Sequence, residues 1–188
     1  MPRITQPPAQ RGSQMWLQRL VNEKPHIFKR ELSHAKFAPR VTQIAWLSPR
    51  KDNGFAEYSD ADFLELIGHT DLQTDLAQFW PSRGPVWDGL ATAVDNVFLV
   101  EAKAHIGELA SPASRAGEKS LEQIEKSLET VKAYLGVNPE YNWTGHFYQY
   151  TNRLAHLYFL REHDVNAYLV FVYFLNDADM KGPGTRAE

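Results

Sequence analysis

The chain has 188 residues, with 20 lysines and arginines against 23 aspartates and glutamates, so its formal net charge is −3. Its apolar content of 43% and aromatic content of 12% are those of a folded globular protein. The absence of cysteine excludes disulfides, thiolate zinc sites and thiol catalysis, and it fits a reducing cytoplasm.

Composition along the chain predicts its organisation. Residues 1–12, rich in proline, glutamine and arginine, predict a disordered basic arm. A single α/β domain is expected over 13–176, followed by a flexible polar tail over 177–188. The first residues lack the apolar core of a secretory signal, and the longest apolar run, 167–175, is too short for a membrane-spanning helix. We therefore expect a cytoplasmic protein with no membrane partner.

Charge is distributed unevenly along the chain. Residues 1–51 hold ten lysines and arginines and two acids, a net charge of +8, whereas residues 52–188 have a net charge of −11. A basic N-terminal segment beside an acidic body could contact phosphates while the body binds metal. Alternatively, the basic side chains only solvate exposed elements. The residues concerned are Arg3, Arg11, Arg19, Lys24, Lys29, Arg30, Lys36 and Arg40.

The first half of the domain contains several short elements. A serine can cap a helix over 13–21, and an apolar segment at 41–47 predicts a strand that a proline ends. A helix over 59–68 is marked by its serine cap, its acidic first turn and its final glycine. Asp71 can cap a second helix that runs to residue 79 or 80, and the segment 81–85 is a loop.

Two apolar segments, 85–90 and 97–105, predict a β-hairpin that carries charge where a buried strand should have none. Residues two apart on a strand share a face, and so do directly opposed residues on neighbouring strands. Asp88, Glu101 and Lys103 should therefore lie side by side if the register is right.

The turn decides that register. A two-residue turn at 95–96 would pair Asp88 with Lys103, and one at 94–95 would pair Asp88 with Glu101. A three-residue turn would pair Asp88 with Ala102 and separate the charges.

The second half predicts two helices and a buried strand. After a loop over 106–117, apolar residues recur at spacings of three and four over 119–135 and mark one buried helical stripe. A further helix runs from residue 144 or 145 to about 162. The segment 167–175 is apolar on both faces, as an interior strand requires. This order predicts an α/β fold with a mixed central sheet flanked by helices.

The charges on the hairpin suggest a chemistry. Two carboxylates and an ammonium group are costly to bury unless something uses them. Mg²⁺ is held by one or two carboxylates together with waters and substrate phosphates, so it is the natural user. A lysine beside it can orient a metal-bound water that attacks phosphorus.

The acid-x-Lys spacing alone is weak evidence. Chance supplies about one match in a chain of this composition. The chain contains two matches, one at 101–103 and one at 179–181, of which only the first closes an apolar strand. The alternative to a reaction centre is a surface salt bridge on an edge hairpin.

An acid on one strand followed by acid-x-Lys on the next resembles the core of the PD-(D/E)XK nuclease superfamily. The resemblance covers residues 57–175 in element order and implies a restriction-endonuclease-like α-β-β-α-β core. Two details differ: Pro85 stands three residues before Asp88 rather than directly before it, and Arg153 stands where a Gln-x-x-x-Tyr helix would have tyrosine after Gln149.

The resemblance implies a metal-dependent nuclease. Asp88 and Glu101 would bind Mg²⁺ or Mn²⁺ with the Ala102 carbonyl as a further ligand, and Lys103 would orient the attacking water. Nucleic acid would be the partner, DNA in preference to RNA, and a homodimer is compatible with this function.

Accessory residues are also expected. The resemblance implies an extra acid from the helix before the hairpin, for which Glu65 is preferred and Glu57 is the alternative. His105 would share the face of Glu101 if the strand continues, and it could donate a proton or contact phosphate. Trp80 and Trp87 could stack on bases, although core packing is the commoner role.

The helix over 145–162 has two faces. Gln149 and Arg153 lie on a polar face with Asn152 and His156, which could meet a phosphate or a metal-bound water, or could simply be solvated. The apolar face contains Phe147, Tyr150, Leu154, Leu157 and Tyr158.

Two other functions stay open. A catalytically silent nucleic-acid-binding or scaffold protein could keep the same fold, and Glu101 with another carboxylate could form the acid/base pair of a sugar hydrolase. The sequence has no phosphate-binding loop, no Gly-x-Ser-x-Gly motif and no His-x-x-x-His spacing.

Overall fold

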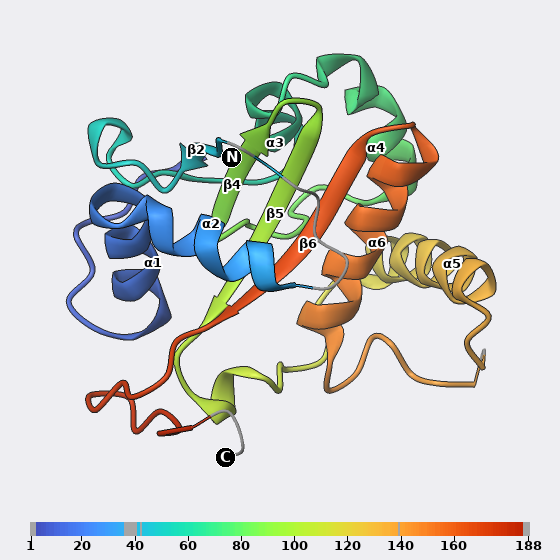
Figure 1. The fold of residues 1–188 in the computed structure, drawn as a ribbon. Coiled ribbons are helices and arrows are strands. Elements are labelled where there is room, and N and C mark those ends of the chain that lie inside the picture. The colour runs from blue at the N-terminus through green and yellow to red at the C-terminus, as the bar shows by residue number, and fades with distance from the viewer. Residues whose placement is uncertain (1–2, 36–40, 42, 139, 186–188) are drawn as a thin grey trace.

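A four-stranded mixed sheet forms the centre of the computed structural model, which describes residues 3–35, 41, 43–138 and 140–185. The strand order is β2 (Ala45–Ser48), β4 (Gly89–Ala93), β5 (Asn96–Lys103) and β6 (Asn166–Tyr173). Strands β2, β4 and β5 are antiparallel to one another in that order, and β6 runs parallel to β5 (Figure 1). The predicted α/β fold with a mixed sheet is confirmed.

Helices cover both faces of this sheet (Figure 1). One face packs against α1 (Gly12–Glu23) and α2 (Pro25–His34), and the other against α3 (Asp60–Leu66), α4 (Gln73–Phe79), α5 (Glu118–Leu135) and α6 (Tyr148–Glu162). The remaining elements are β1 (Arg3–Ile4), β3 (Glu57–Tyr58) and the 3₁₀ helices η1 (Lys51–Asn53), η2 (Thr70–Leu72) and η3 (Ile106–Glu108). Helix α2, which the sequence analysis did not predict, begins at Pro25, a residue suited to the first helical position. No helix of the described residues is long and apolar enough to cross a bilayer.

The hairpin β4–β5 has one of the two favourable registers. Ala93 pairs with Asn96, so the turn consists of Val94 and Asp95, and Val94 has the positive φ of 54° that such a turn needs. Gly89 pairs with Val100, and the same register brings position 88 opposite position 101.

Alternation along β5 divides its side chains between the two cores. Phe98, Val100 and Ala102 pack on the α1–α2 side, and Val97 and Leu99 pack on the α6 side. Because strand residues two apart share a face, Glu101 and Lys103 follow Leu99 toward α6.

The N-terminal segment differs from the predicted disordered arm. Strand β1 pairs with β3, the Gln6 amide N–H bonds the Gly54 carbonyl at 3.0 Å, and the Gln18 side chain bonds the backbone of Ala9 and Pro7. The described residues 3–12 therefore lie along the body of the protein. Lys36 and Arg40 of the predicted basic set, and residue 42 of the predicted strand, lie outside the described residues.

The predicted flexible tail also packs against the body. Asp177 is 2% exposed and accepts hydrogen bonds from Trp16 Nε1 at 2.8 Å and from the Met180 amide at 3.0 Å. A side chain at position 182 would collide with the Ala104 carbonyl, so only glycine permits this approach. Residues 177–185 thereby close over the end of β5.

Candidate active site

Asp88 lies directly before β4 and is half-buried. Its Oδ2 accepts a hydrogen bond from the Ala102 amide at 2.8 Å. Burial, reinforced by the negative charge of Glu101, raises the pKa of Asp88 to about 7. Near neutral pH this carboxyl group is thus ready either to hold a proton or to bind a cation.

Glu101 is the most enclosed carboxylate of the site, at 1% exposure. Its Oε1 is in contact with Lys103 Nζ and accepts from Gln149 Nε2 at 2.8 Å. Its Oε2 accepts from Arg153 Nε at 2.9 Å. Burying an unpaired carboxylate costs on the order of several kcal/mol, because the charge loses its hydration. The three donors offset that cost for Glu101.

Arg153 is fixed from several directions. Its Nη2 donates to the Val86 carbonyl at 2.8 Å and its Nη1 donates to Asn152 Oδ1 at 2.9 Å. Its guanidinium carbon lies 5.3 Å from the centre of the Trp87 ring, which adds a cation–π contact. The arginine therefore holds Glu101 in one orientation and joins α6 to the segment before β4.

Lys103 completes the group from the end of β5. Its side chain is 11% exposed, and Nζ donates to Gln149 Oε1 at 3.2 Å as well as contacting Glu101. Glu101 thus contacts both Lys103 and Arg153, whereas Asp88 bonds the backbone of Ala102 and is influenced by the charges of Glu101, Arg153 and Lys103.

The polar face of α6 points inward. Asn152, Arg153 and His156 are 8%, 5% and 1% exposed, whereas Phe147 and Tyr150 of the predicted apolar face are 60% and 46% exposed. The alternative of a solvated polar face is therefore wrong for this helix. The helix turns this way because the buried Glu101 needs donors, which the apolar face cannot supply.

His156 has a structural environment. Burial lowers its pKa to about 3, so the ring is neutral at physiological pH. A neutral ring can donate from Nδ1 to the Asn152 carbonyl, which lies at 2.8 Å.

A small cavity opens at the Glu101–Lys103 end of the sheet. Its volume is about 40 Å³, which is enough for a water molecule or one small ligand atom. The residues that line it are Glu101, Lys103, Glu108, Leu109, Gln149, Tyr150, Phe171 and Tyr173.

The carboxylates of Asp88 and Glu101 are the candidate ligands for a hard divalent cation of the Mg²⁺ type. Within the part of the chain that the structure describes, no three His, Asp or Glu side chains lie close enough together to form a metal cage. Mg²⁺ does not require one, because it commonly takes one or two carboxylates and completes its shell with water and phosphate. A carboxylate has about four lone-pair sites, and the Ala102 amide occupies one on Asp88.

The structure favours Glu57 over Glu65 as the accessory acid. Glu65 is exposed on α3, and among the residues placed by the structure it makes no hydrogen bond or ion pair with the cluster. Glu57 in β3 is half-buried, and a bridge between Tyr58 and Trp87 brings its strand beside Asp88. Burial raises the pKa of Glu57, and the charge of Glu101 raises it further. Hydrogen bonds from the side chains of Gln14 and Gln6, at 3.3 and 3.2 Å, oppose that shift.

His105 does not extend the strand, because β5 ends at Lys103. Its backbone begins η3, and the Glu108 carboxylate accepts from the amides of Ala104 and His105 at 2.6 and 3.3 Å. The same carboxylate accepts from Ser13 Oγ at 3.0 Å, so this corner joins β5 to α1. Its contacts indicate a structural cap.

The two tryptophans are core residues. Trp80 is 3% exposed and Trp87 is 0% exposed, so neither can stack on a base. Trp87 instead lies beneath Arg153.

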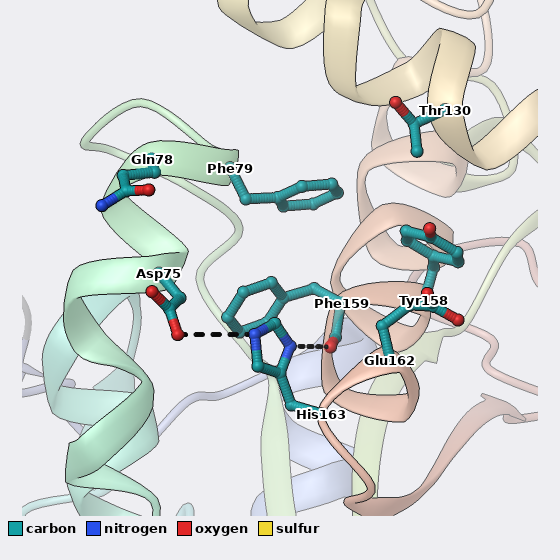
Figure 2. A pocket seen from close by; sticks show the side chains of 8 residues that line it. All are labelled: Asp75, Gln78, Phe79, Thr130, Tyr158, Phe159, Glu162 and His163. Atoms are coloured by element: carbon teal, nitrogen blue, oxygen red, sulfur yellow. Dashed lines mark hydrogen bonds and ion pairs between the residues drawn. The ribbon is translucent and has the colours of Figure 1, made fainter.

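A second cavity, of about 400 Å³, lies at the opposite end of α6 (Figure 2). There His163 Nε2 lies 3.5 Å from Asp75 Oδ2 and links α6 to α4. Because Nδ1 lies 2.8 Å from the Phe159 carbonyl and must donate to it, the Asp75 contact is attractive only when Nε2 also carries a proton. Of the two hydroxyl residues in this cavity, Thr130 and Tyr158, the aliphatic hydroxyl of Thr130 donates to the Lys126 carbonyl. The arrangement is an ion pair between two helices and offers no activated nucleophile.

Comparison of the chain with profiles of known families, with curated proteins and with solved structures finds no match.

Proposed function

We propose that this protein is a metal-dependent nuclease of the PD-(D/E)XK type. The observation that carries the proposal is the grouping of three charged residues at one end of the sheet: Glu101 and Lys103 contact each other and line a small cavity, and Asp88 bonds the backbone of Ala102 between them. A hydrolase for phosphodiesters needs this combination of metal-binding carboxylates and a cation that orients water.

The order of the strands supports the proposal. Helices α3 and α4 precede the antiparallel hairpin β4–β5, helices α5 and α6 follow it, and β6 ends the sheet parallel to β5. Strand β2 adds an antiparallel partner on the other side of β4. Asp88 stands at the start of one hairpin strand and Glu101-x-Lys103 at the end of the next, as the resemblance implies.

Asp88, Glu101 and the Ala102 carbonyl would hold the metal. The Ala102 amide already points at Asp88, and the amide and carbonyl of a strand residue point to the same edge, so that carbonyl also faces Asp88. When bound, Mg²⁺ or Mn²⁺ would supply Lewis-acid activation of water and neutralise charge on the phosphate.

The protein side chains would have separate roles around that site. Lys103 would orient the attacking water and stabilise its hydroxide form. Gln149 would hold Lys103, and Arg153 would keep Glu101 correctly oriented.

The test is hydrolysis by the full chain of labelled single-stranded, duplex and branched DNA and RNA. We expect cleavage with Mg²⁺ or Mn²⁺, loss in EDTA, and loss in Asp88→Asn. Cleavage that survives EDTA would exclude metal-dependent chemistry. If none of these substrates is cleaved, the proposal of a nuclease is wrong.

A silent nucleic-acid-binding or scaffold protein is the second candidate, because Lys103, Gln149 and Arg153 already satisfy Glu101. Calorimetric titration with Mn²⁺ separates the two functions. A nuclease should bind Mn²⁺ specifically and lose that site in Asp88→Asn, whereas a scaffold should show no specific binding in either protein.

A further inference from the structure

Three aromatic rings form a row beside the cavity of the candidate site. Tyr150 of α6 stacks on Phe171 of β6, with ring centres 5.1 Å apart and planes inclined by 23°. Phe171 in turn stacks on Tyr173, at 6.4 Å and 16°. We call these three residues the aromatic row.

The aromatic row belongs to the same site as the charged cluster. All three rings line the cavity that also contains Glu101 and Lys103. Burial raises the pKa of Tyr173, and the charges of Tyr150 and Glu101 raise it further. The hydroxyl of Tyr173 therefore lies close enough to Glu101 to respond to its charge.

The ends of the row are open to solvent. Tyr150 and Tyr173 are 46% and 55% exposed, in contrast to the tryptophans of the core. Single exposed rings are ordinary, but exposed rings that form one contiguous group mark a candidate binding surface. Within the described residues β6 pairs only with β5, so this surface lies at an edge of the sheet.

We propose that the aromatic row stacks on unpaired bases, so that the substrate of the proposed nuclease is single-stranded nucleic acid. This inference rests on the proposed function where it names the substrate of the reaction. Binding of a single strand to the aromatic row does not require that the protein cleave it. A planar ring can stack only on a base whose face is free, and a duplex hides those faces and presents only base edges. Phosphates of a strand held there would lie beside Lys103, which lines the same cavity.

The experiment measures fluorescence anisotropy of a short labelled oligothymidylate with the full chain in EDTA, where binding is observed without hydrolysis. We expect Tyr173→Ala and Tyr150→Ala each to weaken binding about tenfold, the usual consequence of losing one base–aromatic stack. Tyr173→Phe should bind like the wild type, because it keeps the ring. A duplex of equal length should bind more weakly than the single strand.

Tyr134→Ala is the matched control. Tyr134 is 62% exposed on α5, where its ring packs edge-on against Tyr158 rather than in the aromatic row. Its removal should leave binding unchanged. An oligonucleotide of the same length without bases should bind wild type and Tyr173→Ala equally, since only phosphate contacts remain.

The outcomes separate the two proposals. Single-strand binding that depends on Tyr173 but is not followed by cleavage in Mn²⁺ would support the aromatic row and count against the nuclease. Cleavage with equal binding of duplex and single strand, unaffected by either alanine variant, would overturn the aromatic row alone. A change of oligomeric state in Tyr173→Ala, with oligonucleotide binding unchanged, would assign this surface to a protein partner and also overturn the inference.

Discussion

The chain contains the acid-x-Lys spacing twice, and the two copies have opposite environments. Glu101 and Lys103 lie on one face of β5, where Glu101 is almost fully buried and Lys103 contacts it. Asp179 and Lys181 lie in a turn after β6, and both are exposed. Lys181 there adopts a positive φ of 53°, so the two side chains do not share the face of a strand.

The difference shows what gives the spacing its meaning. An extended strand turns a separation of two residues into a common face, and burial makes each charge depend on its neighbours. In the turn, water takes the place of those neighbours, so the same residue types have little influence on one another. Substitutions at the two copies should therefore differ in size.

The largest expected difference is in catalysis. Lys103→Met keeps most of the side-chain volume but removes the ammonium group, and it should slow cleavage about 10²- to 10⁴-fold, the range for a group that assists proton transfer. Lys181→Met is the matched substitution and should cleave at the wild-type rate. Initial rates in Mn²⁺ measure both, and similar rates for the two variants would remove Lys103 from the proposed mechanism.

The next effect is on stability. Arg153→Ala should lower the free energy of unfolding by about 3–5 kcal/mol, because Glu101 would stay buried with a lost cationic partner. Arg50→Ala breaks an exposed pair with Asp52 instead and should leave stability nearly unchanged. Urea denaturation of both variants tests this, and a small loss in Arg153→Ala would show that water replaces the guanidinium at Glu101.

Asp88 should make stability depend on pH in the metal-free protein. Because folding raises the pKa of Asp88 to about 7, its protonated form stabilises the fold below the ordinary pKa near 4, and that stability is lost as pH rises through 7. Asp88→Asn stays neutral and should be more stable than wild type at pH 8 by about 2–4 kcal/mol.

Denaturation of both proteins in EDTA at pH 5 and pH 8 measures this effect, and the difference should shrink at pH 5. Asp179→Asn is the control at the exposed copy and should follow the wild-type curve at both pH values. Equal stability of Asp88→Asn and wild type at pH 8 would mean that the Asp88 carboxyl group is better solvated than its surroundings indicate.

The smallest effect is expected at the other end of α6. His163→Ala removes the ion pair between His163 and Asp75, whose side chains are 30% and 53% exposed, respectively. It should lower the free energy of unfolding by only about 0–1 kcal/mol. Thermal unfolding of this variant beside Arg153→Ala compares an exposed and a buried ion pair on one helix. A loss as large as that of Arg153→Ala would contradict the role assigned to burial.

Local patterns predicted the parts of the fold that depend on neighbours in the sequence. Apolar runs located β5 and β6, and the alternation of strand residues placed Glu101 and Lys103 on one face. The register remained ambiguous because Asp95-Asn96 and Val94-Asp95 are both plausible turns, and only the pairing of Ala93 with Asn96 decides between them.

Long-range contacts account for what the sequence could not predict. The hydrogen bond from Trp16 to Asp177 joins residues 161 apart, so no local pattern marks the tail as ordered. No local pattern marks Glu57 either, because its strand is brought beside Asp88 by the bridge between Tyr58 and Trp87. Glu65 was preferred only because of its position on the helix before the hairpin. On α6, the rule that polar faces meet water failed because a buried carboxylate on another element required donors.

The support of Glu57 by Gln6 and Gln14 has a practical consequence. One of these amides comes from the first few residues, so proteolytic trimming at that end would change the environment of Glu57, whose pKa also responds to the charge of Glu101, without touching either hairpin strand. Preparations that differ only in their starting residue should consequently be compared before rates or metal affinities are assigned to the protein itself.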